Sequence, residues 1–157
     1  MLEQYLPNVN WERVWEATNQ TLYMTGISVV AVFILGIILG LILFLTSKGN
    51  IWENRLVYGI VGAYVNIFRS IPFIILIVLL IPLTKIIMGT MIGEKAALPA
   101  LIIGTAPFYA RMVEIALREI DKGVIEAARA MGAKTSTIIW KVLLPESMPA
   151  IISGITV

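Results

Sequence analysis

The sequence predicts an all-α membrane protein in which several helices cross the bilayer as one bundle. Of its 157 residues, 59% are hydrophobic and only 14% are charged, whereas apolar residues make up roughly 45–50% of a soluble domain. Residues 17–47 contain no Asp, Glu, Lys or Arg. This run is longer than the ~20 residues that a helix needs to cross ~30 Å of hydrocarbon. We therefore expect residues 1–157 to form a single transmembrane domain.

The N-terminal part is expected to be an uncleaved membrane anchor. Residues 10–18 place Trp11 and Trp15 about one turn apart among charged side chains, a pattern typical of a short helix in the headgroup zone. The first span is expected at about residues 22–46, because this apolar run is too long for the core of a signal peptide. It ends at the turn-forming residues 47–50.

The middle of the chain predicts one surface helix and two further spans. Residues 51–69 are amphipathic and are expected to lie on the membrane surface. The second span is expected at about 70–88, with Ser70 as N-cap and Pro72 in the first turn. On this interpretation Arg69 stands at a helix start on the inner interface rather than in a ligand-binding loop. A third span is expected at about 96–116, after a short polar turn.

Two pairs of small or helix-breaking residues within the spans leave alternatives open. Gly36 and Gly40 form a small-xxx-small pair, which either packs against another helix or faces lipid. Gly104 and Pro107 interrupt the pattern of the third span. This interruption predicts either a packing kink or a freed carbonyl that lines a substrate path.

Arg111 and Glu114 lie one turn apart near the end of the third span. Charged groups at this depth must pair, reach the interface or face water. They are expected to form an intrahelical pair that anchors the end of the span, with a gate as the alternative. A fourth span is expected to start at residue 148. The ten residues from there to Val157 rise only about 15 Å, so a complete crossing is expected to need further sequence.

The distribution of basic residues predicts the orientation, because Lys and Arg are retained on the cytoplasmic side. With the N-terminus outside, nine of the 12 basic residues fall on the inner side and three on the outer side. The inner ones are Lys48, Arg55, Arg69, Arg111, Arg118, Lys122, Arg129, Lys134 and Lys141, and the outer ones are Arg13, Lys85 and Lys95. Residues 121–144 are then expected in the cytoplasm.

The composition excludes several classes of chemistry. The chain has no Cys and no His, which excludes disulfides, thiolate nucleophiles, imidazole bases and the usual zinc sites. A net charge of +2 with dispersed basic residues does not suggest a nucleic-acid partner. No Gly-x-x-x-x-Gly-Lys-Ser/Thr loop is present, so we expect no nucleotide site and no cofactor. A membrane hydrolase is disfavoured, because Ser28 in the first span has no Lys, His or Asp near it.

Residues 121–144 predict a helix, a bend and a second helix. Gly132 allows the bend, Thr135 or Ser136 is expected to cap the second helix, and Pro145 is expected to end it. The apolar residues 138–140 and 142–143 can lie against the bundle. The first helix suits docking by a partner, because small side chains allow close approach and a carboxylate offers a charge; these residues are Ala127, Ala128, Ala130 and Glu126. The alternative is an ordinary helical loop.

This segment also resembles a known signature. The order Glu-Ala-Ala, three residues, Gly, nine residues, a hydrophobic residue, one residue, Leu-Pro is similar to the cytoplasmic signature of permease subunits of bacterial ABC importers. It falls on Glu126, Ala127, Ala128, Gly132, Val142, Leu144 and Pro145, with Met131 beside them. Residues 65–73, 106–114 and 141–146 resemble the methionine-uptake branch of that family.

The resemblance implies the ABC importer permease fold with a cytoplasmic coupling helix at Glu126, in the bacterial cytoplasmic (inner) membrane. It also implies a homodimeric pore, two cytosolic ATPase subunits that bind ATP and magnesium, and an extracytoplasmic substrate-binding lipoprotein. The implied substrate is D-methionine, L-methionine or both. Because members of the family continue through the fourth span and one more, the chain resembles a C-terminally truncated copy. The alternatives are an importer for another small solute and a non-transporting scaffold whose helix recruits a partner.

Overall fold

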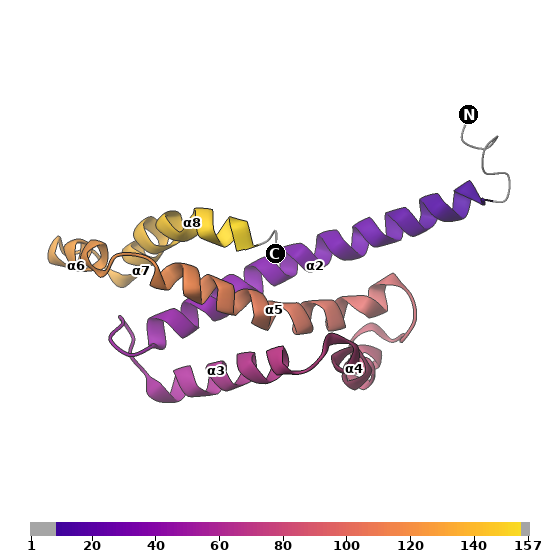
Figure 1. Cartoon of the computed structure of the whole chain (residues 1–157), viewed down its shortest axis with the longest axis horizontal. Helices are drawn as coiled ribbons and strands as arrows, with labels where there is room; N and C mark the ends of the chain where they lie inside the picture. The colour runs from indigo at the N-terminus through magenta and orange to yellow at the C-terminus, as the bar shows by residue number, and fades with distance from the viewer. Residues whose placement is uncertain (1–8, 155–157) are drawn as a thin grey trace.

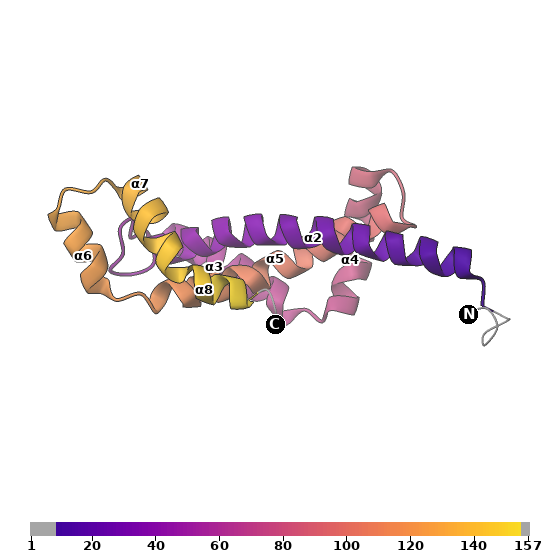
Figure 2. The same ribbon diagram turned by 90° about the horizontal axis from the view of Figure 1, so that it is seen from above.

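The structure is a computed structural model that describes residues 9–154. Two long helices, α2 (Trp11–Thr46) and α5 (Glu94–Arg118), form its axis and make the most extensive contact between any two helices described. They lie side by side in both views of the molecule (Figures 1 and 2). Both are long and apolar enough to cross a membrane. The span expected at 96–116 lies entirely within α5, and the one expected at 22–46 within α2.

Helix α2 is a single element of 36 residues, so the prediction of a separate headgroup helix at residues 10–18 is wrong. At 1.5 Å per residue the helix is about 54 Å long. Asn10 caps it by accepting a hydrogen bond from the backbone N–H of Arg13 at 3.1 Å. The hydroxyls of Thr18 and Thr21 donate to carbonyls four residues earlier. Thr18 and Thr21 therefore satisfy their hydroxyl groups within one continuous helix, which runs through the charged residues without a break.

The contact between α2 and α5 depends on the two glycines of the first span. A Cβ atom on Gly40 would lie 2.6 Å from Cβ of Val113, and one on Gly36 would collide with the ring of Tyr109. Both glycines are buried. The Gly36–Gly40 pair is thus a helix-packing face rather than a lipid-facing one, because only hydrogen side chains let the two backbones approach this closely.

Helix α3 (Arg55–Ser70) and helix α4 (Phe73–Met88) are bent by 114° at the break between them. Helix α3 runs beside α2 and α5, while α4 lies across them and is seen nearly end-on in Figure 1. The expectation that residues 51–69 lie on the membrane surface is therefore wrong. Helix α4 has 16 residues and is about 24 Å long, shorter than the hydrocarbon core. The pair is long and apolar enough for one span only when taken together.

Pro72 causes this break. It has no backbone N–H, and its ring forces the preceding Ile71 into an extended conformation with φ −86° and ψ 125°. Ser70 is the last residue of α3, where its hydroxyl donates to the carbonyl of Asn66 at 2.8 Å. Ser70 is therefore not the N-cap that the sequence predicted. Pro72 itself occupies the N-cap position of α4, without a side-chain hydrogen bond. Arg69 stands at the end of a helix, not at the start of one.

The C-terminal part folds against one end of the bundle. It contains α6 (Lys122–Ala130), α7 (Thr135–Ile138), a π-helical turn η1 (Ile139–Leu143) and α8 (Leu144–Ser153). Figure 2 shows α6 and α7 at the end of the molecule opposite Trp11, and α8 returns along α5. The fourth span expected from residue 148 begins inside α8, and its residues 155–157 lie outside the described part of the chain, as do residues 1–8 of the expected anchor.

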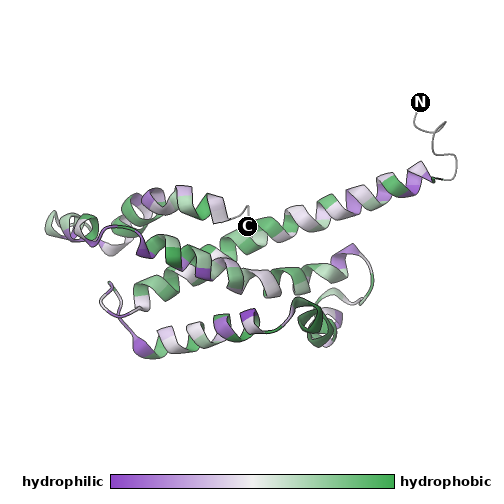
Figure 3. Ribbon diagram, viewed as in Figure 1, coloured by the Kyte–Doolittle hydropathy of each residue, from purple (hydrophilic) through white to green (hydrophobic). Residues whose placement is uncertain are grey.

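In Figure 3 the C-terminal part of α2 and most of α4 are coloured as hydrophobic, whereas the N-terminal turns of α2 are more hydrophilic. Many apolar side chains of these two helices are exposed in the isolated chain, among them Leu22, Val30, Ile34, Ile74 and Ile86. In a soluble protein such a surface would cause association. In a bilayer it is the surface that contacts lipid.

Candidate functional site

The hairpin of α6 and α7, residues 121–138, is built from two local caps. The side chain of Asp121 accepts a hydrogen bond from the backbone N–H of Gly123 at 2.8 Å and starts α6. At the other end, the N–H of Gly132 donates to Arg129 at 2.9 Å and that of Ala133 to Ala128 at 3.0 Å. Gly132 has φ +79°, a conformation that costs little only for glycine. The predicted bend at Gly132 is confirmed.

One face of this hairpin is held against the bundle. Ile125 and Ala128 from α6 share the main apolar core with Leu117 of α5 and with Ile138 and Leu143 farther along. Positions 125 and 128 are one turn apart, so a single stripe of α6 faces inward. The hairpin is thereby attached to the bundle through this shared core and through η1, and a displacement of its outer face would be transmitted to the core.

The predicted coupling residues divide between the two faces. Glu126, Ala127, Gly132 and Pro145 are exposed, and Met131 is 82% exposed. Ala128 and Leu144 are instead buried, at 5% and 6% exposure. The exposure expected of Ala128 on a docking face is therefore not found, because its position one turn after Ile125 directs it into the core; its coupling role stays a prediction. The outer face consists of Glu126, Ala127, Ala130, Met131 and Gly132.

The second half of the hairpin differs from the predicted helix in its cap and its end. Lys134 is the N-cap of α7 and makes no side-chain hydrogen bond, so Thr135 and Ser136 are not caps but the first residues of the helix. Pro145 does not end the helical path either. The backbone continues through η1 into α8, and the N–H of Leu144 donates to the carbonyl of Ile139, five residues back. This wide turn accommodates the missing N–H and the ring of Pro145.

Arg111 and Glu114 form the predicted ion pair, but it belongs to a larger cluster. Glu114 is only 1% exposed and also accepts from Nη2 of Arg118 at 2.7 Å and from the hydroxyl of Tyr58 at 3.4 Å. Nη2 of Arg111 donates to Oδ1 of Asn66 at 3.0 Å. The cluster therefore connects α5 to α3, which suits an anchor. A role as a gate stays a prediction.

Three members of this cluster escaped the sequence analysis. Arg118 follows Glu114 by four residues, a spacing at which helical side chains meet, so the sequence did contain a signal for it. Tyr58 and Asn66 lie on another helix, 56 and 45 residues from their partners. No periodicity within α5 could have indicated them.

Gly104 and Pro107 do not interrupt α5, which is continuous from Glu94 to Arg118 and contains both Pro99 and Pro107. A Cβ atom on Gly104 would lie 2.9 Å from Cδ2 of Leu76 and 3.0 Å from Cε2 of Phe73. Gly104 therefore permits close packing of α4 on α5. Pro107 is fully buried. The predicted interruption is thus wrong, and the packing interpretation holds for Gly104.

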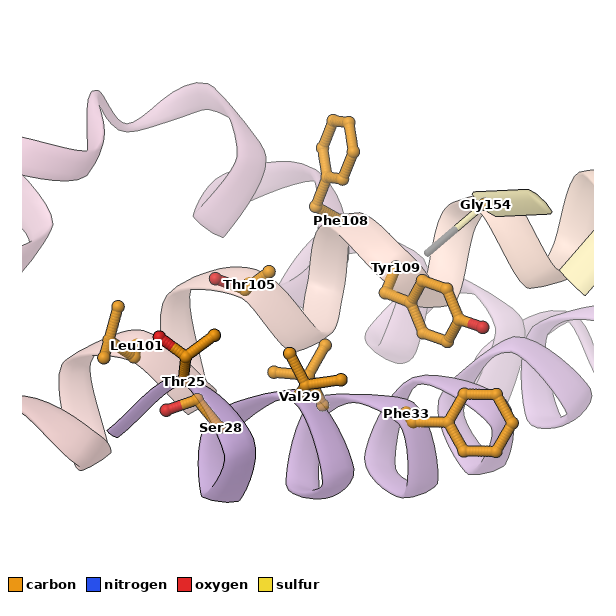
Figure 4. A pocket seen from close by; sticks show the side chains of 10 residues that line it. Thr25, Ser28, Val29, Phe33, Leu101, Thr105, Phe108, Tyr109 and Gly154 are labelled. Atoms are coloured by element: carbon orange, nitrogen blue, oxygen red, sulfur yellow. The ribbon is translucent and has the colours of Figure 1, made fainter. Parts of the chain in front are cut away.

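A cavity of about 270 Å³ lies between α2 and α5 and reaches Gly154 at the end of α8. Figure 4 shows the hydroxyls of Thr25, Ser28 and Thr105 grouped at one end of it and Phe33 and Tyr109 toward the other. Oγ of Ser28 is buried without a hydrogen-bond partner. The described residues that line the cavity include no acid or base, so Ser28 has no partner there for nucleophilic chemistry. Within residues 9–154, no group of His, Cys, Asp or Glu side chains could hold a metal ion.

Comparison with known proteins identifies the fold and the family. Residues 32–157 match the family described as binding-protein-dependent transport system inner membrane component. The whole chain is 67% identical over 157 residues to the methionine import system permease protein MetP of Bacillus subtilis (strain 168), of which it spans 71%. It is 51% identical over 144 residues, 92% of the chain, to the D-methionine transport system permease protein MetI of Escherichia coli (strain K12) and spans 64% of that protein.

A solved structure agrees with this similarity. The chain superposes on the methionine ABC transporter MetNI, in an inward-facing conformation in its native crystal form, with a TM-score of 0.89. The two are 48% identical, and the match covers 94% of this chain and 70% of the other. The agreement extends over the helical arrangement and the sequence of most of the chain. The chain therefore belongs to the family of binding-protein-dependent transport system inner membrane components.

Proposed function

We propose that the protein is the membrane-spanning subunit of an ATP-driven methionine importer, for D-methionine, L-methionine or both. The observation that supports this most directly is the hairpin of α6 and α7, which joins the main apolar core through Ile125 and Ala128 and presents Glu126 and Met131 outward. Relatives at 67% and 51% identity are methionine permeases. The energy for transport is supplied by another protein, because the sequence has no phosphate-binding loop.

The proposed partners are two cytosolic ATPase subunits, a second copy of the permease and an extracytoplasmic binding lipoprotein. ATP and magnesium are bound by the ATPase subunits and not by this chain. Closure of the ATPase dimer would displace the outer face of the hairpin, and the buried contacts of the shared core would carry that displacement into the pore. The permease itself catalyses no reaction.

The proposed orientation has the N-terminus outside and the hairpin in the cytoplasm. Seven basic residues belong to the turns and helix ends on the hairpin side, three to the opposite side, and Arg69 and Arg111 lie between. The seven are Lys48, Arg55, Arg118, Lys122, Arg129, Lys134 and Lys141, and the three are Arg13, Lys85 and Lys95. The excess still favours a cytoplasmic hairpin, although Arg69 and Arg111 no longer contribute to it.

Reconstitution tests the proposal. The complete permease, its ATPase and its binding lipoprotein are placed in vesicles, and uptake of radiolabelled methionine is measured with ATP inside the compartment that contains the ATPase. We expect ATP-dependent uptake that unlabelled D- or L-methionine competes away. Uptake of another solute alone would favour an importer of different specificity, and ATPase binding without any uptake would favour the scaffold.

A further inference from the structure

Arg69 places a guanidinium group about midway along the bundle, beside the middle of α5. Its guanidinium carbon lies 5.4 Å from the centroid of the Phe108 ring. Phe108 lies in the middle of α5, about 21 Å along the helix from Glu94 and about 15 Å from Arg118 at 1.5 Å per residue. Arg69 is therefore far from both ends of a helix that is long and apolar enough to cross a membrane.

This cation has no carboxylate partner among residues 9–154. The ion pairs of the described chain join Glu114 to Arg111 and to Arg118, and Arg69 is exposed. The face of Phe108 attracts the guanidinium but brings no negative charge. A cation at membrane depth is costly against lipid and normally faces the interior of a bundle or a water-filled path.

Asn66 supplies a second set of donors one turn before Arg69. Its Oδ1 accepts from Nη2 of Arg111 at 3.0 Å, and Arg111 is itself held by Glu114. The orientation of the amide is therefore fixed, and its NH₂ group has no partner among the described residues. Residues three apart on a helix lie side by side, so this amide and the guanidinium of Arg69 can donate to one acceptor.

Asn66 and Arg69 do not lie on the lipid-facing stripe of α3. Leu56, Ile60 and Ile67 are 70%, 64% and 57% exposed, and their spacings of four and seven residues put them on one stripe. At about 100° per residue, Asn66 is about 100° and Arg69 about 160° around the helix from Ile67. Helix α3 thus has one outer face suited to lipid and another suited to an anion.

We propose that Arg69 and Asn66 form a subsite in the transport path that binds the α-carboxylate of the imported amino acid. This inference rests on the proposed function and adds the group that recognises the substrate within the membrane. The planar guanidinium matches a carboxylate. Phe108 holds it in place, and the open side of the pair keeps binding weak enough for release, as conduction through a path requires.

The test compares Arg69→Gln with Arg55→Gln in the complete importer in vesicles. Both changes remove one positive charge from an exposed Arg on α3, but Arg55 stands at the hairpin end of that helix. The measurement is methionine imported per ATP hydrolysed, with assembly followed by size-exclusion chromatography. We expect Arg69→Gln to lower this ratio at least tenfold in an assembled complex, Arg69→Lys to lower it less, and Arg55→Gln to leave it unchanged.

Three results would overturn the subsite. Undiminished import per ATP in Arg69→Gln excludes it, and loss of assembly together with import would make Arg69 a contact between subunits. The comparison is also run with and without anionic lipid, because a phosphate headgroup is another acceptor; a defect seen only with anionic lipid would assign Arg69 to lipid instead. If the wild-type complex imports no methionine, the proposed function fails. The ratio is then measured with an amino acid that it does import, which bears the same α-carboxylate.

Discussion

Three side chains from two helices donate to the carboxylate of Glu114, which is 1% exposed. We predict that Glu114→Gln lowers the free energy of unfolding by about 2 kcal/mol, the scale of a hydrogen bond to a charged group. The full penalty for a broken buried ion pair is not expected, because Arg111 and Arg118 are 23% and 46% exposed and can be rehydrated. Thermal unfolding in detergent measures the change. Glu126→Gln removes the same charge from an exposed position and should leave the midpoint unaltered.

Gly132 provides a test of the hairpin itself. Proline fixes φ near −65°, whereas Gly132 has φ +79° and donates its N–H to Arg129. Gly132→Pro is expected to abolish methionine uptake and leave membrane insertion intact. Gly89 is a matched control, because it has φ +71° and donates to Lys85 after α4. Gly89→Pro should cost similar stability yet retain transport, and full transport by Gly132→Pro would remove the coupling role of the hairpin.

Charge on the outer face of the hairpin is tested by Glu126→Lys. The side chain is exposed and makes no contact within the described chain that would stabilise the fold, so stability should stay within about 0.5 kcal/mol of the wild type. We expect uptake and transport-linked ATPase activity to be lost, because the reversed charge would repel a partner group suited to a carboxylate. Glu119→Lys makes the same change at an exposed position between α5 and α6 and should transport normally.

The helical period would have placed Ala128 correctly. Ile125 and Ala128 share a stripe, so the burial of Ala128 was available from the sequence once Ile125 was taken as the inward residue. The seven-residue signature obscured this, because it groups residues by family pattern and not by face. Arg69 is different: its position depends on where Pro72 redirects the chain, and the residues around it fit a helix start as well as a helix end.

At the scale of the helix pair, the contact between α2 and α5 depends on Gly36 and Gly40. We predict that Gly40→Val destabilises the bundle by about 2 kcal/mol, since overpacking of a tight contact typically costs about 1–3 kcal/mol and a Cβ atom there would lie 2.6 Å from Val113. Thermal unfolding checks this. Gly26→Val on the same helix is the control, because a Cβ atom there meets nothing within 4 Å. Equal stability of the two variants would contradict the assigned packing face.

Most elements were predictable where a local pattern is strong. The uncharged run of residues 17–47 and the apolar stretch of 96–116 both lie within helices, and the bend at Gly132 is present. The failures are at boundaries. The charged residues between Trp11 and Glu16 suggested a separate helix. In the structure α2 continues through them, and the hydroxyls of Thr18 and Thr21 donate to carbonyls of the same helix. Pro72 suits the first turn of a helix or a break equally well, and only packing of α3 beside α5 decides between them.

For the whole molecule, the absence of Cys allows the orientation to be tested with single introduced thiols. Met131 and Ile92 are 82% and 87% exposed and belong to opposite ends of the bundle. In intact cells, a membrane-impermeant maleimide should label Ile92→Cys directly and Met131→Cys only after permeabilisation. The reverse pattern would contradict the proposed N-terminus-outside orientation. Equal exposure of the two positions makes each the control for the reactivity of the other.

The wide turn η1 also fixes how everything after it is rotated. It contains one more residue per turn than an α-helix would at that point, and a single residue corresponds to about 100° around the axis. With this offset in place, Leu144 and Ile151 reach the core. Removing one residue from Ile139–Leu143 would therefore rotate α8 about its axis by more than a quarter of a revolution. The rotation would expose the inward side chains of α8, even though no atom of the hairpin's outer face had been altered.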